Sequence, residues 1–156
     1  YSKATCGYGV FSAETGEILS LKNGIPASMT GADNRFLADL DLPAREPRYA
    51  VILDGSAQAE TVVSLDCESQ WYYSRISPDG RFVVSCDEYP EERVWYYRVY
   101  DLEKNTVSDP LVITPDNDRR PVLRCYPGGF RIFCSEYTDS GSFLRETSLG
   151  FYSYEP

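Results

Sequence analysis

The stretch that decides the fold runs from Ser77 to Asp101 and reads SPDGRFVVSCD, then a short acidic loop, then VWYYRVYD. Residues 77–80 are predicted to form a tight turn, because Pro78 presets φ for its first central position and Gly80 accepts a positive φ. The runs around this turn, residues 71–76, 81–87 and 94–101, are rich in aromatic and β-branched residues. Such runs indicate β-strands.

The same unit recurs on both sides of this stretch. DGRFV at Asp79–Val83 resembles DNRFL at Asp33–Leu37, and residues 78–89 resemble residues 127–137 with one deletion. In this alignment Phe82 matches Phe130 and Cys86 matches Cys134. The offsets of about 46 and about 48 residues lie in the range of roughly 40 to 50 that is typical of propeller blades.

On these residues the sequence resembles the TolB-like and WD-repeat-like β-propeller families, in which a Ser-Pro-Asp-Gly turn joins the first two strands of a blade. YDLEKN at Tyr100–Asn105 is similar to the turn between the third and fourth strands in those families. The resemblance covers about residues 27–137 and implies antiparallel four-stranded blades. The Gly-His and Trp-Asp dipeptides of the stricter WD repeats are missing, so the TolB-like comparison fits better.

We therefore predict an all-β chain of antiparallel four-stranded propeller blades in a ring that is incomplete or closed by oligomerisation. The predicted single domain, 1–156, divides into a half blade at 6–21 (third and fourth strands), blades at 27–65 and 71–113, and a partial blade at 121–154. Propellers close with about four to eight blades, so we expect a fragment, an oligomer or an unusually small ring. The alternative is a two-sheet β-sandwich, which needs no internal repeat.

Composition narrows the classes of partner. The chain carries 15 basic and 24 acidic residues, a formal charge of −9, which repels nucleic acid. No apolar stretch approaches the roughly 20 residues of a membrane span. The five cysteines show no Cys-x-x-Cys spacing, and we interpret Cys86 and Cys134 as small apolar fillers between sheets. A disulfide from Cys6 is the alternative, and it would place the protein outside the cytoplasm; export, periplasmic or extracellular, is favoured over a cytoplasmic location.

The sequence predicts no catalytic residue, metal or cofactor. Histidine is absent, which removes Ser-His-Asp and Cys-His nucleophiles and His-ligated zinc. Thr114–Asp118 offers alternate oxygen ligands but lacks the central glycine and the distant glutamate of an EF-hand, and is interpreted as a turn. The aromatic clusters at Trp71–Tyr73 and Trp95–Tyr97 are assigned mainly to the core.

The leading hypothesis is a non-catalytic protein-interaction (scaffold) module that binds a protein partner or itself. In propellers of this kind, the loops between second and third strands share a face with those that lead to the next blade. The predicted partner-binding residues on these loops are Tyr89, Glu91, Arg93, Asp116, Arg119, Arg120 and Tyr137. The alternatives are the propeller portion of a prolyl-oligopeptidase-type serine peptidase and a small carbohydrate-binding protein.

Overall fold

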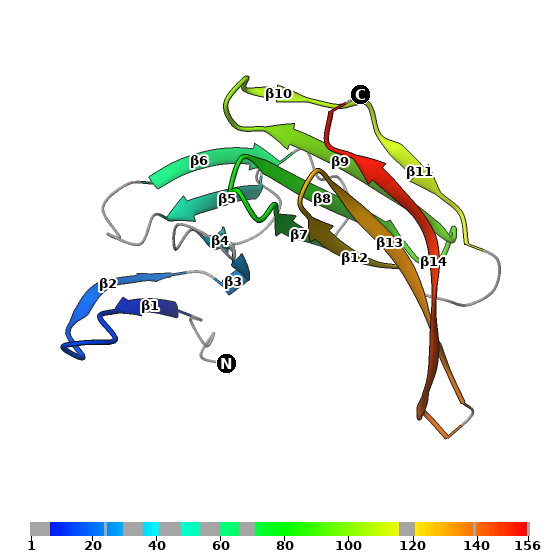
Figure 1. Cartoon of the computed structure of the whole chain (residues 1–156), viewed down its shortest axis with the longest axis horizontal. Helices are drawn as coiled ribbons and strands as arrows, with labels where there is room; N and C mark the ends of the chain where they lie inside the picture. Colours follow the sequence, from blue (N-terminus) through cyan, green and yellow to red (C-terminus); the bar gives the residue numbers. More distant parts are fainter. Residues whose placement is uncertain are drawn as a thin grey trace.

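The computed structural model is all-β. It describes residues 7–23, 25–29, 36–40, 48–53, 60–65, 71–115, 121–138 and 140–155. These ranges hold fourteen strands and no helix (Figure 1). All pairings between neighbouring strands are antiparallel, as predicted.

The described strands form four separate sheets. The first sheet pairs β1 (Gly7–Phe11) with β2 (Ile18–Asn23). The second has the order β3 (Ile25–Met29), β4 (Phe36–Leu40), β5 (Arg48–Leu53) and β6 (Glu60–Leu65). The third contains β7 (Trp71–Ile76), β8 (Phe82–Tyr89), β9 (Val94–Asp101), β10 (Thr106–Val107) and β11 (Leu111–Ile113). The fourth has the order β12 (Pro121–Tyr126), β13 (Gly129–Tyr137) and β14 (Phe143–Ser153).

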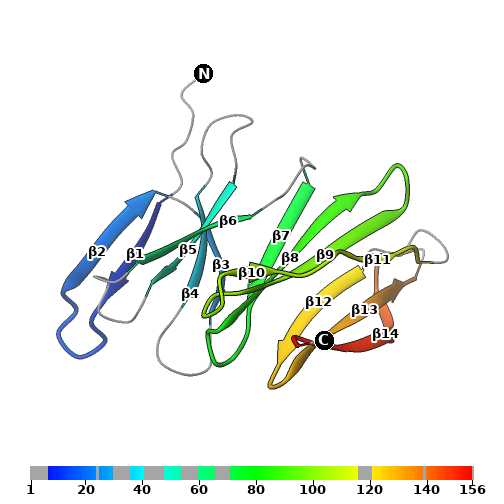
Figure 2. The ribbon, with the colours of Figure 1, turned by 90° about the horizontal axis from the view of Figure 1, so that it is seen from above.

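The sheets follow one another in chain order, with β1–β2 at one end of the row and β12–β14 at the other (Figure 2). β7, the first strand of its sheet, contacts β3 and β12, the first strands of the two neighbouring sheets. This is the arrangement of propeller-like blades whose first strands lie closest to a common axis. The described residues therefore form an open row of blade-like sheets and not the two facing sheets of a sandwich.

The turn at Ser77–Gly80 forms as predicted. Gly80 has φ of 74°, and its N–H donates to the Ser77 carbonyl oxygen at 2.9 Å. The Ser77 Oγ accepts the N–H of Phe82 at 2.9 Å, and the Ser77 N–H donates to the Phe82 carbonyl oxygen at 2.8 Å. Ser77 and Phe82 thus close the β7–β8 hairpin.

The fourth strand of the third sheet, the last of the blade predicted at 71–113, is broken into two short strands. β10 pairs with the end of β9, and β11 pairs with the segment Trp95–Tyr97. Pro110 lies between them and has no N–H for the ladder. Ser108 bridges the gap, because its N–H donates to the Val99 carbonyl oxygen and its Oγ accepts the Val99 N–H.

The main described core lies between the third and fourth sheets. The third sheet contributes one face of β8 and β9, and the fourth contributes one face of β12 and β13 together with Tyr154. The buried members of this cluster are Phe82, Val84, Cys86, Trp95, Tyr97, Val99, Leu123, Phe130, Ile132 and Tyr154. Trp95 and Tyr97 confirm the assignment of that aromatic run to the core; the side chains of Trp71 and Tyr72 lie outside the described part.

The alignment of Phe82 with Phe130 is wrong by one residue. The two rings lie in the same cluster on opposite sides of the interface, so they are not equivalent positions of two blades. The β12–β13 hairpin is closed by Tyr126 and Gly129, which places Gly129 where Phe82 lies in the β7–β8 hairpin. A shift of one residue reverses the face of every side chain on a strand.

Cys86 and Cys134 are affected by the same shift. Cys86, a free thiol, and Cys134 are both buried, which confirms that they act as small fillers. They do not occupy matching places, because Cys86 faces the fourth sheet and Cys134 shares the face of β13 that carries Phe130 and Ile132. Cys125 is also a free thiol. Cys6 and Cys67 lie outside the described residues, so the alternative of a disulfide between Cys6 and another cysteine stays a prediction.

Candidate functional site

Three of the predicted partner-binding residues lie on the β8–β9 turn. The ring of half-buried Tyr89 packs edge to face on that of Tyr96, with centroids 5.5 Å apart. Glu91 and Arg93 are exposed, and Arg93 has φ of 56° in a turn held by hydrogen bonds from backbone N–H groups to the Tyr89 and Pro90 carbonyl oxygens. The turn therefore presents a fixed aromatic ring beside charged side chains.

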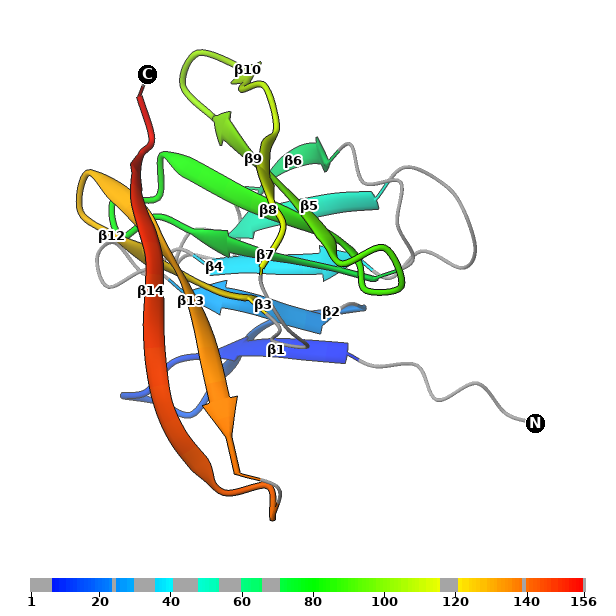
Figure 3. The ribbon, with the colours of Figure 1, turned by 90° about the vertical axis from the view of Figure 1, so that its right-hand side faces the viewer.

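Tyr137 belongs to a different hairpin. It ends β13, is 62% exposed, and packs edge to face on Phe143 at the start of β14, with centroids 6.0 Å apart. The tip of this hairpin projects beyond the sheets, away from the β8–β9 turn (Figures 1 and 3). Asp116, Arg119 and Arg120 lie outside the described residues. The predicted residues that the structure does describe thus fall into two separate groups.

The face of the fourth sheet that is turned away from the third sheet was not predicted from the sequence as a functional surface. Side chains alternate along β13, so Phe130 and Ile132 enter the core while Arg131 and Phe133 point to the other side. We call this second surface the outer face. It carries Val122, Arg124, Tyr126, Arg131, Phe133, Ser135, Tyr137, Phe143, Glu146, Ser148 and Phe151. None of the described sheets covers it, because the fourth sheet ends the row (Figure 2).

Two arginines lie directly opposite each other on the outer face. Arg124 of β12 is the cross-strand partner of Arg131 of β13. Like charges at directly opposed positions of an antiparallel pair are destabilising. The Arg124 Nη2 is neutralised by the Glu146 carboxylate at 2.5 Å, and its guanidinium lies 5.0 Å above the ring of Phe133. Arg124 therefore has both an acidic and an aromatic partner within the sheet.

Arg131 is held by aromatic rings. Its guanidinium carbon lies 5.9 Å from the ring centre of Tyr126 and 5.6 Å from that of Phe151. Among the described residues, no carboxylate lies within ion-pair distance of it. The outer face thus carries one arginine with an acidic partner and one stacked arginine whose charge no described carboxylate neutralises.

β14 adds exposed apolar side chains to this region. Phe143 is 60% exposed and Phe151 is 51% exposed. Leu144 and Leu149, also exposed, are the extra residues at two irregularities of the β13–β14 ladder, where two residues of β14 face one step of β13. Such bulges re-aim side chains and disturb the pairing of an edge with a further strand. A partner is therefore expected to contact the face of the fourth sheet and not the free edge of β14.

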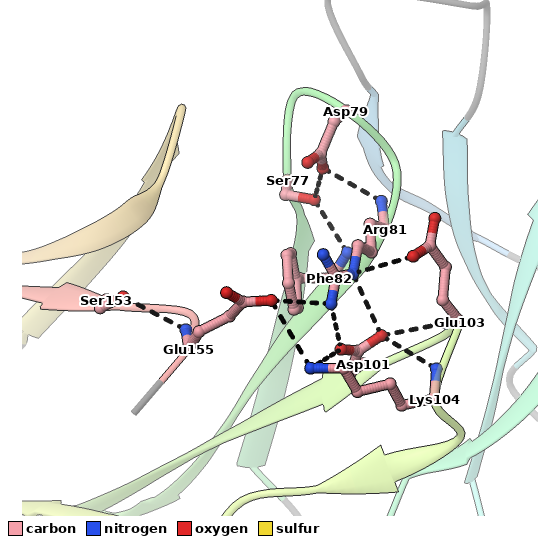
Figure 4. Close-up of polar contacts among 9 residues, drawn as sticks. All are labelled: Ser77, Asp79, Arg81, Phe82, Asp101, Glu103, Lys104, Ser153 and Glu155. Atoms are coloured by element: carbon pink, nitrogen blue, oxygen red, sulfur yellow. Dashed lines mark hydrogen bonds and ion pairs between the residues drawn. The ribbon is translucent and has the colours of Figure 1, made fainter.

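A second polar cluster is centred on Arg81, and its ion pairs link parts of the chain to one another (Figure 4). The Arg81 Nη2 lies 2.7 Å from Asp101 Oδ2 and 2.8 Å from Glu155 Oε1, and its Nε lies 3.3 Å from Glu103 Oε2. Hydrogen bonding from Arg81 lowers the pKa of Asp101 to about 2, and the N–H groups of Glu103 and Lys104 contribute to this shift. Each carboxylate around Arg81 thus already has a cationic partner, so the cluster ties elements together.

The C-terminal segment carries this tie across to the fourth sheet. Tyr154 stacks on Phe82, with centroids 4.8 Å apart, and its hydroxyl donates to the Tyr126 carbonyl oxygen at 2.9 Å. Glu155 follows and reaches Arg81. The β7–β8 hairpin is therefore fastened to the two residues that follow β14 by one ring stack and one ion pair.

The buried thiol and phenols of the core are not activated for chemistry. Burial raises the pKa of Cys86 to about 12 and also raises the pKa values of Tyr73 and Tyr97. The two tyrosine hydroxyls lie 3.3 Å apart, and the Tyr73 hydroxyl donates to the Pro121 carbonyl oxygen at 3.3 Å. A thiol with so high a pKa stays protonated near neutral pH and is a poor nucleophile.

Among the described residues, no group of three or more Cys, Asp or Glu side chains is arranged to hold a metal ion. The same residues include no helix that is long and apolar enough to cross a membrane.

No protein-family model and no curated protein matches the sequence. Among solved structures, the chain is similar to the β-propeller domain of the Trilobed protease from Pyrococcus furiosus, with 15% sequence identity and a TM-score of 0.41. The match covers 80% of this chain and 43% of that chain. The present chain thus spans less than half the length of the structure that it matches.

Proposed function

We propose that this chain is a non-catalytic protein-interaction module made of TolB-like propeller blades. The observation that carries the proposal is the uncovered apolar surface of the fourth sheet. Among the described residues, five of the eight large apolar side chains that are exposed belong to β13 and β14. They are Tyr137, Phe143, Leu144, Leu149 and Phe151.

The size and composition of this surface support a protein partner. At about 200 Å² for each aromatic side chain, Tyr137, Phe143 and Phe151 together leave roughly 350 Å² uncovered. This area is divided between the Tyr137–Phe143 pair and Phe151, which lies opposite Arg131. The largest apolar patch that a typical monomeric protein exposes is about 300–600 Å² and is often functional. Tyrosine, phenylalanine and arginine are also the residue types enriched at the centre of protein interfaces. The predicted β8–β9 residues Tyr89, Glu91 and Arg93 supply a second, separate contact region in this proposal.

The absence of histidine from the chain supports the non-catalytic part of the proposal, because it removes the most common general base. The Ser77–Gly80 turn supports the TolB-like part, because it joins the first two strands of its sheet as in that family.

The proposal is tested by comparative capture. Immobilised wild-type protein is exposed to a proteome, and the bound proteins are quantified by mass spectrometry against a variant with Tyr137→Ser and Phe151→Ser. The matched control is Val112→Ser, which removes an exposed apolar side chain from the third sheet. We expect specific partners to be lost about tenfold or more with the double variant and kept with the control, since interface anchors contribute about 2 kcal/mol or more.

A solution-mass measurement by light scattering accompanies the capture, because the partner can be a second copy of the chain. Loss of self-association in the double variant alone would also support the proposal. An unchanged set of captured proteins, together with an unchanged mass, would contradict it.

A further inference from the structure

We infer that the outer face of the fourth sheet binds an acidic polypeptide segment, with Arg131 as the residue that receives its carboxylate. This inference rests on the proposed function and names the chemistry of the partner. It begins with the cross-strand pair of Arg124 and Arg131, which places two positive charges side by side on one face of a strongly acidic chain. Glu146 neutralises only the first of them.

The surroundings of Arg131 prepare its guanidinium for a carboxylate. Tyr126 and Phe151 both lie in cation–π contact with it. A guanidinium that stacks on rings keeps its N–H donors in the plane of the group, where they fit the two oxygens of a carboxylate. Because the rings already restrict the side chain, less conformational entropy is lost when the carboxylate binds.

The apolar neighbours indicate a polypeptide. Phe151 is half exposed beside Arg131, and Tyr137 and Phe143 form a second exposed aromatic pair nearer the tip of the hairpin. A segment that bears both acidic and apolar side chains satisfies the arginine and covers these rings together. The bulges at Leu144 and Leu149 disfavour addition of a regular strand to the edge of β14, so the segment is expected to lie across the face.

The charge of the whole chain argues against a polyanion. With 24 acidic against 15 basic residues, the chain repels nucleic acid and anionic membranes at long range. One unneutralised arginine within an aromatic surface suits one or two carboxylates better than a row of phosphates. A single-stranded polynucleotide therefore serves as a competitor in the test.

The test measures binding of a fluorescein-labelled peptide that carries two glutamates among phenylalanine and valine residues. The full chain is titrated as wild type, Arg131→Met and Arg131→Lys, and fluorescence anisotropy is recorded. Arg145→Met is the matched control, because Arg145 is an exposed arginine of the same sheet on the opposite face, paired with Glu136 at 2.8 Å. A second peptide carries glutamine in place of each glutamate.

We expect Arg131→Met to weaken binding about tenfold or more, since a hydrogen bond to a charged group contributes about 1.5–3 kcal/mol. Arg131→Lys should recover only part of the affinity, and Arg145→Met should leave it within about twofold. The glutamine peptide should bind wild type about as weakly as the glutamate peptide binds Arg131→Met. Binding of the glutamine peptide to Arg131→Met should be only slightly weaker again, because the two changes remove the same contact.

Each contrary outcome identifies what is wrong. The inference is overturned if wild type shows no saturable binding up to about 1 mM peptide, if Arg131→Met binds like wild type, or if a polynucleotide or inorganic phosphate displaces the peptide at equal concentration. If the double variant Tyr137→Ser, Phe151→Ser abolishes capture of partners while Arg131→Met does not, the proposed interaction surface is supported and the proposed acidic partner is rejected. If neither variant affects capture, the proposed function fails as well.

Discussion

Replacing Phe130 by alanine is the most direct test of how the third and fourth sheets pack. Phe130 is 2% exposed and lies within ring-contact distance of Tyr97, Tyr152 and Tyr154. Removing a fully buried phenylalanine destabilises a protein by about 3–5 kcal/mol, because lost burial adds to the cavity that remains. This is a large part of the roughly 5–15 kcal/mol that holds a domain folded.

Phe133→Ala is the matched control on the same strand. Phe133 is half-buried on the outer face, where its ring lies under the Arg124 guanidinium. Its removal leaves no core cavity, so we expect a loss of about 1–2 kcal/mol from reduced burial and from the lost cation–π contact. The difference between the two variants should therefore be about 2–3 kcal/mol.

The assay is urea unfolding followed by tryptophan fluorescence, to which Trp95 contributes from within the same cluster. With a slope of about 2 kcal/mol/M, the midpoint should fall by about 2 M for Phe130→Ala and by less than about 1 M for Phe133→Ala. Phe130→Leu provides a milder change if the alanine variant does not fold. Equal midpoints for the two alanine variants, or a reversed order, would refute the assignment of faces on β13 and with it the definition of the outer face.

Three further predictions follow from the geometry. Gly129→Ala should destabilise the protein by about 3 kcal/mol, because the new Cβ would lie 2.3 Å from the Tyr152 carbonyl oxygen. Its control, Gly128→Ala, should cost only about 1 kcal/mol, because Gly128 has φ of +79° but open space around it, and equal urea midpoints would contradict this. The pKa of Asp101 is lowered to about 2 from 3.8, so its contribution to stability is complete above about pH 4 and is lost as the pH falls toward 2. Asp101→Asn should therefore reduce stability near pH 6 and flatten the decline of stability between pH 4 and 2. An unchanged dependence of the urea midpoint on pH would count against the role of Asp101. Cys86 should resist iodoacetamide at pH 8 until the protein is unfolded, because burial raises its pKa to about 12. A peptide map that shows rapid labelling of Cys86 in the native protein would contradict this.

Local chemistry allowed much of the fold to be predicted from the sequence. The Ser77–Gly80 turn forms as expected, and β7 and β9 have the predicted bounds of Trp71–Ile76 and Val94–Asp101. These features depend on neighbouring residues, namely Pro and Gly in the turn and aromatic and β-branched side chains in the strands. Tyr137 was predicted to lie on a loop and to contact a partner; it ends β13 and is 62% exposed.

Register across hairpins could not be predicted in the same way. Sequence similarity aligned Phe82 with Phe130, but β12 and β13 are joined by a two-residue turn at 127–128, and Gly129 takes the closing position. Which face of a strand is buried depends on the pairing and on the neighbouring sheet, and a one-residue shift exchanges the two faces. The arginines of the outer face were missed for this reason, since their opposition is visible only once the register of β12 and β13 is known.

The two sheets differ in the face that each turns toward the end of the row. The third sheet presents the apolar side chains of Phe82, Val84 and Trp95, and the fourth sheet covers them. The third sheet also carries Arg75 on this face, opposite Val84, and at the corresponding place the fourth sheet carries Arg124 opposite Arg131. An apolar sheet packed there would bury the charge of Arg131 without a carboxylate, and an unpaired buried charge is strongly unfavourable. Any segment that covers this face is therefore expected to supply a carboxylate at Arg131, whether it belongs to a partner, to another copy of the chain or to the same polypeptide.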